Sequence, residues 1–138
     1  MKKTILITGC SSGIGYCVAK GLHARGYRVF ATARRRDSVE MLLAEGLESF
    51  HLNLTDSNSI NFAFEEVMRR TDGELYALFN NGAYGLPGAV EDLSRDALRE
   101  QFETNVFGWQ ELTNLVVPVM RRQGYGREIL ERIVGQAR

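Results

Sequence analysis

The amino-acid sequence predicts an α/β fold: a doubly wound parallel sheet, incomplete, with about four strands and flanking helices. One observation behind this prediction is that short apolar runs of strand length alternate with segments whose apolar residues recur at helical spacing. The other is a glycine-rich turn between the first strand and the first helix. Right-handed crossovers between the parallel strands make this a doubly wound open sheet. In such sheets ligands bind beyond the carboxyl ends of the strands, so the loops after strands one and four are expected to bind a ligand.

The first strand and helix are predicted from the start of the chain. Residues 4–8 form the first apolar run. Ile14, Val18 and Leu22 follow at intervals of four residues and predict a helix with one apolar face. Gly26 is expected to end this helix, because glycine is a favourable residue just past a helix C-terminus.

The next elements continue the alternation. Residues 27–32 predict the second strand, residues 37–45 a short helix, and residues 49–54 a weak third strand. Asp56 is expected to cap the following helix, whose apolar residues share one face: Ile60, Phe64, Val67 and Met68.

The fourth predicted strand is the continuous apolar run at residues 75–79, which is typical of a strand buried on both faces. A loop over residues 80–87 follows it. One long helix is then expected, with apolar residues at spacings of three or four: Leu98, Phe102, Trp109, Leu112 and Val116.

The chain is expected to divide after residue 126. Residues 1–126 form a half domain, whereas residues 127–138 carry apolar pairs at helical spacing and predict a helical tail; a short strand over residues 132–134 is the alternative. A helical tail would leave the fourth strand as an unpaired apolar edge, which favours self-association or a homo-oligomer.

The composition of the 138 residues is that of a single soluble domain, with 44% hydrophobic and 25% charged residues. Seventeen basic residues balance seventeen acidic ones, so the charge does not favour a nucleic-acid partner. No apolar window approaches the ~18 residues of a membrane span, and we expect a cytoplasmic protein. Cys10 and Cys17 have no nearby histidine, so neither a metal site nor a disulfide framework is indicated.

The turn after the first strand has the glycine spacing of a phosphate-binding loop. Glycines there let backbone N–H groups approach a phosphate, and the dipole of the following helix adds favourable charge. The alternative is a tight turn that only packs the helix on the strand. The residues predicted to contact the cofactor here are Gly9, Ser11, Ser12, Gly13, Ile14 and Gly15.

Three motifs together resemble the short-chain dehydrogenase/reductase family: Thr-Gly-x-x-x-Gly-x-Gly at residues 8–15, Asn-Asn-Gly-Ala at residues 80–83, and Asn-Val-Phe-Gly at residues 105–108. The second differs from the family's Asn-Asn-Ala-Gly by exchange of its last two residues. The resemblance covers residues 4 to about 126 and implies a Rossmann-like fold and hydride transfer between a nicotinamide cofactor and a carbonyl or alcohol substrate. It also implies that Asn105 is the helix asparagine of the family's catalytic tetrad.

Three arginines follow the second strand, where dinucleotide-binding folds discriminate between the two nicotinamide cofactors. With no carboxylate present to repel a phosphate, NADP is favoured, and Arg34 is the first candidate for its 2′-phosphate, Arg35 the second. The alternative is a solvated basic turn.

The resemblance also assigns the rest of the cofactor site. It places Asn53 and the following Leu54 beside the adenine, although most relatives carry aspartate at the first position. Asn81, Gly82 and Ala83 would line the ribose and nicotinamide side. The alternatives are a turn at the end of the third strand and a glycine-containing loop after the fourth.

The catalytic Ser, Tyr and Lys of the family belong to a later part of its fold. Tyr16 and Lys20 have the Tyr-x-x-x-Lys spacing, but they lie away from the apolar stripe of their helix and are expected to face solvent. Asn105 is expected on the core face with Phe102 and Trp109.

Three functional hypotheses follow. The first is the cofactor-binding half of an NADP-dependent short-chain oxidoreductase that acts on a carbonyl/alcohol pair, with this chain inactive alone. The second is a non-catalytic NADP(H)-binding module that acts with a partner chain. The third is a folding-incompetent remnant, which would expose apolar surface and bind no cofactor.

Overall fold

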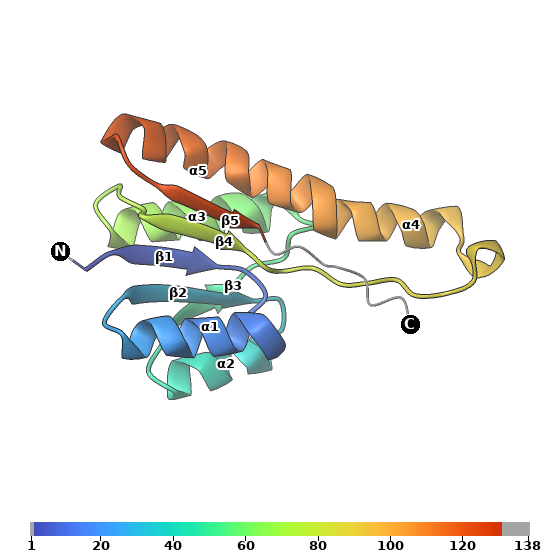
Figure 1. The fold of residues 1–138 in the computed structure, drawn as a ribbon, viewed down its shortest axis with the longest axis horizontal. Helices are drawn as coiled ribbons and strands as arrows, with labels where there is room; N and C mark the ends of the chain where they lie inside the picture. Colours follow the sequence, from blue (N-terminus) through green and yellow to red (C-terminus); the bar gives the residue numbers. More distant parts are fainter. Residues whose placement is uncertain (1, 131–138) are drawn as a thin grey trace.

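A five-stranded parallel sheet forms the centre of the molecule in a computed structural model that describes residues 2–130 (Figure 1). The strand order is β3-β2-β1-β4-β5, which is that of a doubly wound sheet, so the predicted fold class is confirmed with one more strand than expected. The strands are β1 (Thr4–Ile7), β2 (Arg28–Ala33), β3 (Glu48–His51), β4 (Ala77–Asn80) and β5 (Arg127–Leu130).

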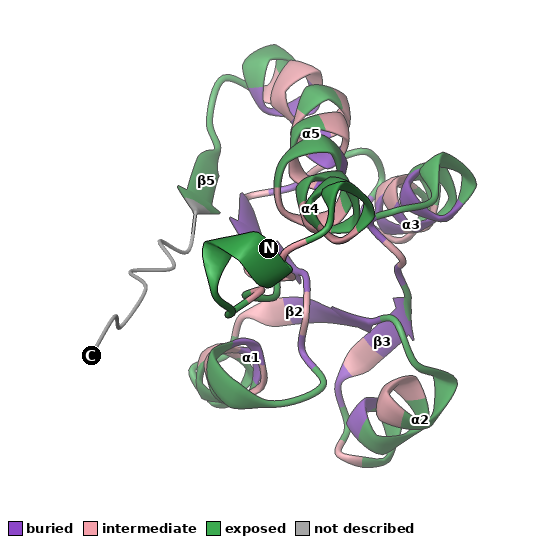
Figure 2. Ribbon diagram, turned by 90° about the vertical axis from the view of Figure 1, so that its right-hand side faces the viewer, coloured by how far each residue is buried: buried purple, intermediate pink, exposed green. Residues whose placement is uncertain are grey.

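Helices cover both faces of the sheet. One face carries α1 and α2, and the other carries α3 and α5, while α4 projects past the carboxyl ends of the strands (Figures 1 and 2). A π-helical segment joins α4 to α5 and is called η2 below. The helices are α1 (Gly13–Ala24), α2 (Arg36–Ala44), α3 (Ser57–Arg70), α4 (Arg95–Phe102), η2 (Glu103–Gly108) and α5 (Trp109–Gln123), and a 3₁₀ turn spans Val90–Asp92.

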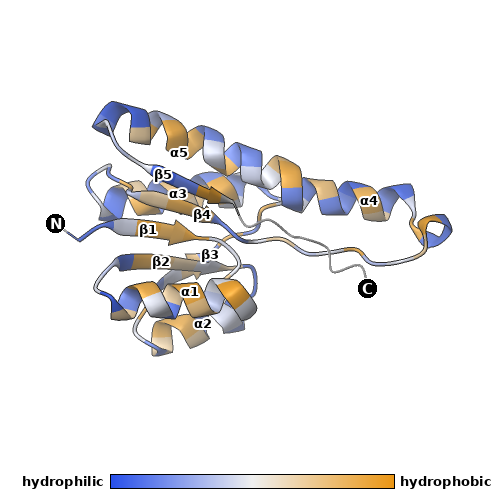
Figure 3. Ribbon diagram, viewed as in Figure 1, coloured by the Kyte–Doolittle hydropathy of each residue, from blue (hydrophilic) through white to orange (hydrophobic). Residues whose placement is uncertain are grey.

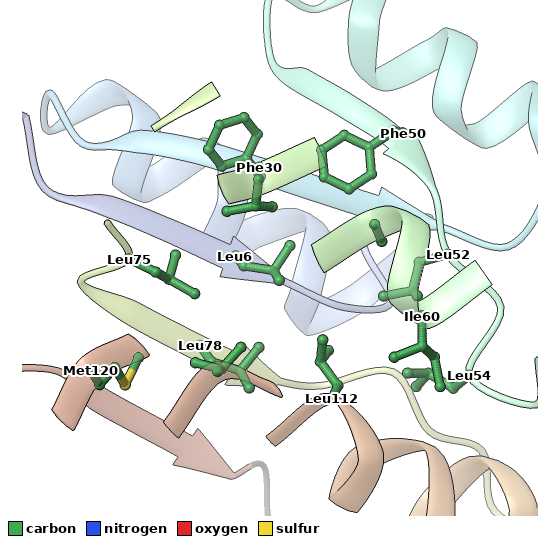
Figure 4. Close-up of a cluster of buried hydrophobic side chains, with 13 residues drawn as sticks. Leu6, Phe30, Phe50, Leu52, Leu54, Ile60, Leu75, Leu78, Leu112 and Met120 are labelled. Carbon is green, nitrogen blue, oxygen red and sulfur yellow. The ribbon is translucent and has the colours of Figure 1, made fainter. Parts of the chain in front are cut away.

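The apolar core consists of two layers, one on each side of the sheet. In β1, Leu6 points to the layer under α3 and α5, whereas Ile5 and Ile7 point to the layer under α1 and α2. Figure 4 shows the first layer, in which Phe30 and Phe50 stack obliquely with ring centroids 5.9 Å apart. Apolar and polar residues alternate along the helices in Figure 3, and buried apolar residues of α3 and α5 belong to the first layer.

The end of the described chain differs from the prediction. Residues 127–130 form β5 rather than a helix, in register with β4 so that Leu78 lies opposite Glu128. The backbone N–H and C=O groups of β4 hydrogen-bond with those of residues 127–130, and the helical spacing of apolar residues in the tail gives no information about this pairing. The prediction that β4 is an unpaired edge strand is therefore wrong, because β4 pairs with β5. Self-association through β4 is accordingly no longer expected. The remainder of the tail lies outside the described residues.

The apolar stripe of α1 is also shifted from the prediction. Gly15 and Ala19 are the buried residues of this helix, whereas Ile14 is 56% exposed. The small Gly15 lets the helix start pack closely on the loop after β1, because a Cβ at this position would overlap the carbonyl oxygen of Gly9. Close approach of the backbone thus decides the orientation of α1.

The long helix predicted after β4 is interrupted. Its second half packs as expected, with Leu112 and Val116 fully buried. The side chains of Leu98 and Phe102 are 39% and 51% exposed, because α4 lies beyond the sheet. The π-helical turns of η2 separate the two parts, and such segments often accompany functional sites.

Gly108, at the end of η2, lies directly against the loop after β3. A Cβ at Gly108 would overlap the carbonyl oxygen of Leu54 and come within 2.7 Å of the Leu54 Cβ. Gly108→Ala should therefore lower the free energy of unfolding by about 1–3 kcal/mol, which urea denaturation would measure.

Gly21→Ala is the matched control for this substitution, since Gly21 lies in α1 and its added Cβ would meet nothing within 4 Å. It should raise the free energy of unfolding by roughly 0.5–1 kcal/mol. An equal effect of the two substitutions would contradict the contact between Gly108 and Leu54.

Candidate cofactor site

A cavity of about 640 Å³ lies at the carboxyl ends of the strands, where the fold class predicts a ligand. Its walls come from the loops after β1, β2, β3 and β4 and from α4 and η2. Seven of the predicted cofactor residues line it: Gly9, Ser11, Arg34, Asn53, Leu54, Gly82 and Ala83.

The glycine loop forms the floor of this site at the start of α1. Gly9 and Gly13 have φ angles of +68° and +59°, a left-handed backbone that favours glycine. Ser12, Gly13 and Ile14 are exposed at the N-terminus of α1, where free N–H groups and the helix dipole favour an anion. The loop therefore has the backbone geometry expected of a phosphate site.

Cys10 lies within the same loop but is turned into the core. Its side chain is fully buried and its backbone N–H donates to the carbonyl oxygen of Thr32 at 2.8 Å. Burial raises the pKa of the Cys10 thiol to about 12, against a smaller opposite effect of the hydrogen bond with Thr32. The thiol is thus protonated near neutral pH and serves packing rather than chemistry.

Thr8 fastens the loop after β4 to the loop after β1. Its buried Oγ1 accepts hydrogen bonds from the backbone N–H groups of Asn81 at 3.0 Å and Gly82 at 2.7 Å. The Asn81 side-chain amide in turn donates to the carbonyl oxygens of Thr8 and Gly9. Asn81 and Gly15 therefore shape the site from behind and do not line the cavity.

Asn80, the first residue of the same motif, faces away from the cavity. Its side-chain amide donates to Thr113 Oγ1 at 3.2 Å and to Glu128 Oε1 at 3.1 Å. This residue thus ties β4 to α5 and β5, and its role is structural.

Two residues from η2 and α5 hold the outer part of the loop after β4. Trp109 Nε1 donates to the carbonyl oxygen of Gly82 at 2.7 Å. Asn105 Nδ2 donates to the carbonyl oxygen of Tyr84 at 2.7 Å, and its Oδ1 accepts from the Tyr84 N–H at 3.2 Å. Asn105 is half-buried and binds this loop, and the expected shared core face with Phe102 is wrong because Phe102 is exposed.

The three arginines after β2 have different surroundings. Arg35 makes two hydrogen bonds to the carboxylate of Asp37, which lower the pKa of that carboxyl, and Arg36 lies 3.5 Å from Glu40. Arg34 is exposed, lines the cavity, and has no ionic partner among residues 2–130. The assignment of Arg34 or Arg35 to a 2′-phosphate stays a prediction.

Tyr16 and Lys20 belong to a separate contact of α1 with Glu45, the residue after α2. Tyr16 packs partly buried against the core layer under α1 and α2, so the expectation that it faces solvent is wrong, whereas Lys20 is exposed. The Tyr16 hydroxyl donates to Glu45 at 2.8 Å, and Lys20 Nζ lies 2.6 Å from the same carboxylate. These bonds raise the pKa of Tyr16 and lower that of Glu45. Neither side chain lines the cavity, which agrees with the exclusion of this pair from catalysis.

Several lining residues were not predicted from the sequence. They are Thr8, Ala33, Leu52, Thr55, Tyr84, Glu100, Glu103 and Thr104. Thr8 and Ala33 directly precede predicted residues, so the ends of their strands could have indicated them. Glu100, Glu103 and Thr104 follow helical spacing on one face, but only the position of α4 and η2 in the fold shows that this face meets the cavity.

The backbone of the loops after β1 and β4 forms the floor of this cavity. Gly9 and Gly82 approach so closely that a Cβ on Gly9 would lie 2.6 Å from the Gly82 Cα, which leaves backbone rather than side chains at the cavity floor. In the described part of the chain, no three metal-binding side chains gather at one place. Nor does any helix there have the length and apolarity to cross a membrane.

Comparison with known proteins agrees with this geometry. The chain is 38% identical over 130 residues to the oxidoreductase YbbO of Escherichia coli K12, a match that covers 94% of this chain and 48% of YbbO. The structure of a short-chain dehydrogenase from Streptomyces avermitilis matches 94% of this chain and 49% of its own with a TM-score of 0.87 and 34% identity. An alcohol dehydrogenase from Thermococcus sibiricus, solved with 5-hydroxy-NADP, matches with a TM-score of 0.83 and 27% identity over 94% and 57% of the two chains.

The chain therefore spans about half the length of the relatives it matches. The family model that matches it is that of the short chain dehydrogenases, and the match extends over residues 3–130. This range includes β5, so the expected boundary at residue 126 falls inside the family match. With the sheet order, the glycine loop and the motif after β4 in agreement, the chain belongs to the short-chain dehydrogenase family of oxidoreductases.

Proposed function

We propose that this chain is the NADP(H)-binding half of a short-chain oxidoreductase that interconverts a small-molecule carbonyl compound and its alcohol. The carrying observation is the exposed Arg34 on the cavity wall, without an ionic partner in the described part of the chain and directly after β2, the strand that pairs with β1. A guanidinium binds a phosphate through charge-assisted bidentate hydrogen bonds. One solved relative was solved with 5-hydroxy-NADP and another with NADPH, which supports an NADP-type cofactor here.

Each part of the proposed site has a separate task. The backbone N–H groups of residues 11–14 at the start of α1 would hold the pyrophosphate, and Arg34 the 2′-phosphate. Asn53 and Leu54 would border the adenine, while Gly82 and Ala83 would border the ribose and nicotinamide. The bound cofactor would supply the hydride, and the protein supplies its orientation.

We further propose that these residues alone do not turn over a substrate. The only Tyr-x-x-x-Lys in the sequence is engaged with Glu45 outside the cavity, and the chain spans about half the length of its relatives. Asn105 is then a positioning residue, because its amide holds the loop that carries Ala83 and Tyr84 against η2. A cofactor-binding module without turnover is the alternative function, favoured by the same cavity.

Calorimetric titration of the folded chain with NADPH and with NADH tests the proposal directly. Binding with NADPH preferred is the expected result. Absence of binding to both cofactors, in a chain shown to be folded by circular dichroism, would contradict the proposed site.

Arg34→Ala should weaken NADPH binding by about 1–3 kcal/mol, because a charge-assisted pair to the 2′-phosphate is lost, and should leave NADH binding nearly unchanged. Calorimetry with both cofactors measures the two effects. Arg35→Ala is the matched control, since Arg35 pairs with Asp37 and does not line the cavity. If Arg34→Ala weakened NADPH and NADH binding equally, the assignment of Arg34 to the 2′-phosphate would be wrong.

Asn105→Ala should release the Tyr84 backbone, because both hydrogen bonds of the Asn105 amide to Tyr84 disappear. Hydrogen exchange of the Tyr84 amide should accelerate by roughly five- to tenfold, which corresponds to one net hydrogen bond of about 1 kcal/mol. Gln101→Ala removes only a 3.5 Å contact to the same carbonyl oxygen and serves as the control. Unchanged exchange in Asn105→Ala would show that the loop is held by other contacts.

A further inference from the structure

The position of Arg34 determines where a bound adenine would lie, an inference that rests on the proposed function. In NADP(H) the 2′-phosphate and the adenine are attached to the same ribose, so a phosphate at Arg34 brings the base to the adjoining cavity wall. One part of this wall is the loop after β3, with Asn53 and Thr55, and another is the helix face with Glu100 and Glu103. These residues are therefore the candidates for contact with the edge of the base.

Asn53 offers this base a hydrogen-bond donor and no free amide oxygen. Its Oδ1 accepts from the Thr55 N–H at 3.1 Å and from the Thr55 hydroxyl at 2.9 Å. The Thr55 backbone N–H can only donate, so the atom of the Asn53 amide that it contacts is the oxygen. The NH₂ group of Asn53 has no hydrogen-bond partner among the described residues. This NH₂ group can donate to a ring nitrogen of adenine, but the exocyclic N6 amine is itself a donor and needs an acceptor elsewhere.

Glu103 is the charged side chain best placed to accept a hydrogen bond from the N6 amine. The backbone of Gly108 lies against Leu54, the residue after Asn53, with the nearest atoms so close that no Cβ fits between them. Glu103 is the first residue of η2 and Gly108 is the last, whereas Glu100 lies in the preceding α4, so Glu103 is the nearer of the two glutamates to Gly108 along the helix. Both carboxylates line the cavity, and neither has a hydrogen-bond or ionic partner within residues 2–130.

We propose that Glu103 accepts a hydrogen bond from the N6 amine of the adenine, while the Asn53 amide donates to the adjacent ring nitrogen. Together they form an acceptor and a donor that complement adenine. Hypoxanthine carries a carbonyl oxygen in place of the amine and a proton on the adjacent ring nitrogen, N1. The oxygen would face the Glu103 carboxylate without a proton between them, and the N1–H would face the Asn53 NH₂ group, which is also a donor. Glu103 is then a specificity-determining residue that makes the site read the base as well as the phosphates.

Titration with NADPH and with its hypoxanthine analogue, reduced nicotinamide hypoxanthine dinucleotide phosphate, tests the assignment. The unmodified chain should bind NADPH at least about tenfold more tightly than the analogue, as expected for a matched pair of hydrogen bonds to a base edge. Glu103→Gln should lower this ratio severalfold, because the glutamine amide can accept from an amine and also donate to a carbonyl oxygen, while Asn53 still favours the unprotonated ring nitrogen of adenine. Glu103→Ala should lower the ratio as well.

Glu100→Gln is the matched control, since it removes the neighbouring charge on the same helix face and should keep the preference for NADPH. A chain that binds neither NADPH nor NADH would overturn the proposed function and this inference together. Binding of NADPH with equal affinity for the analogue, or a preference that is undiminished in Glu103→Gln, would overturn only the role of Glu103. Equal loss of discrimination in Glu100→Gln would likewise exclude a specific role for Glu103.

Discussion

The close approach of the loops after β1 and β4 is the constraint on which the site depends. Gly9 and Gly82 meet backbone to backbone, and the Thr8 hydroxyl accepts from two consecutive N–H groups of the facing loop. Because β1 and β4 are neighbours in the sheet, this contact closes the carboxyl edge at the centre of the molecule. The glycine loop, α1 and the wall with Ala83 all take their positions from it.

The elements of the central sheet were predictable from the sequence because they depend on burial. β1 and β2 are apolar runs with both faces covered, and the Asp56 cap of α3 accepts from the Asn58 N–H as its sequence position indicates. The tail was not predictable, since the pairing of β5 with β4 is a contact between segments far apart in the sequence. Local helical spacing at residues 127–130 carries no information about such a partner.

Some residues that line the cavity could be predicted from sequence motifs, whereas others are brought to it only by the packing of the helices. Gly9 and Arg34, which line the cavity, were predicted from the residue types that phosphate contacts require at strand ends, and Asn53 was predicted from the family resemblance. Glu103 and Thr104 were missed because they lie on a helix that meets the cavity only after α5 has packed on the sheet. Arg35 has a residue type suited to a phosphate contact, but its guanidinium is paired with the carboxylate of the nearby Asp37.

The π-helical segment η2 has a consequence for how this family member can vary. One residue more or less within Glu103–Gly108 would rotate α4 relative to α5 by about 100°. Such a change would leave Leu112 and Val116 in the core, yet turn Glu103 away from the cavity and Asn105 away from Tyr84. Insertions and deletions between Glu103 and Gly108 would therefore change the wall of the cavity while the buried face of α5 keeps its place, so the length of η2 can vary separately from the packing of α5 on the sheet.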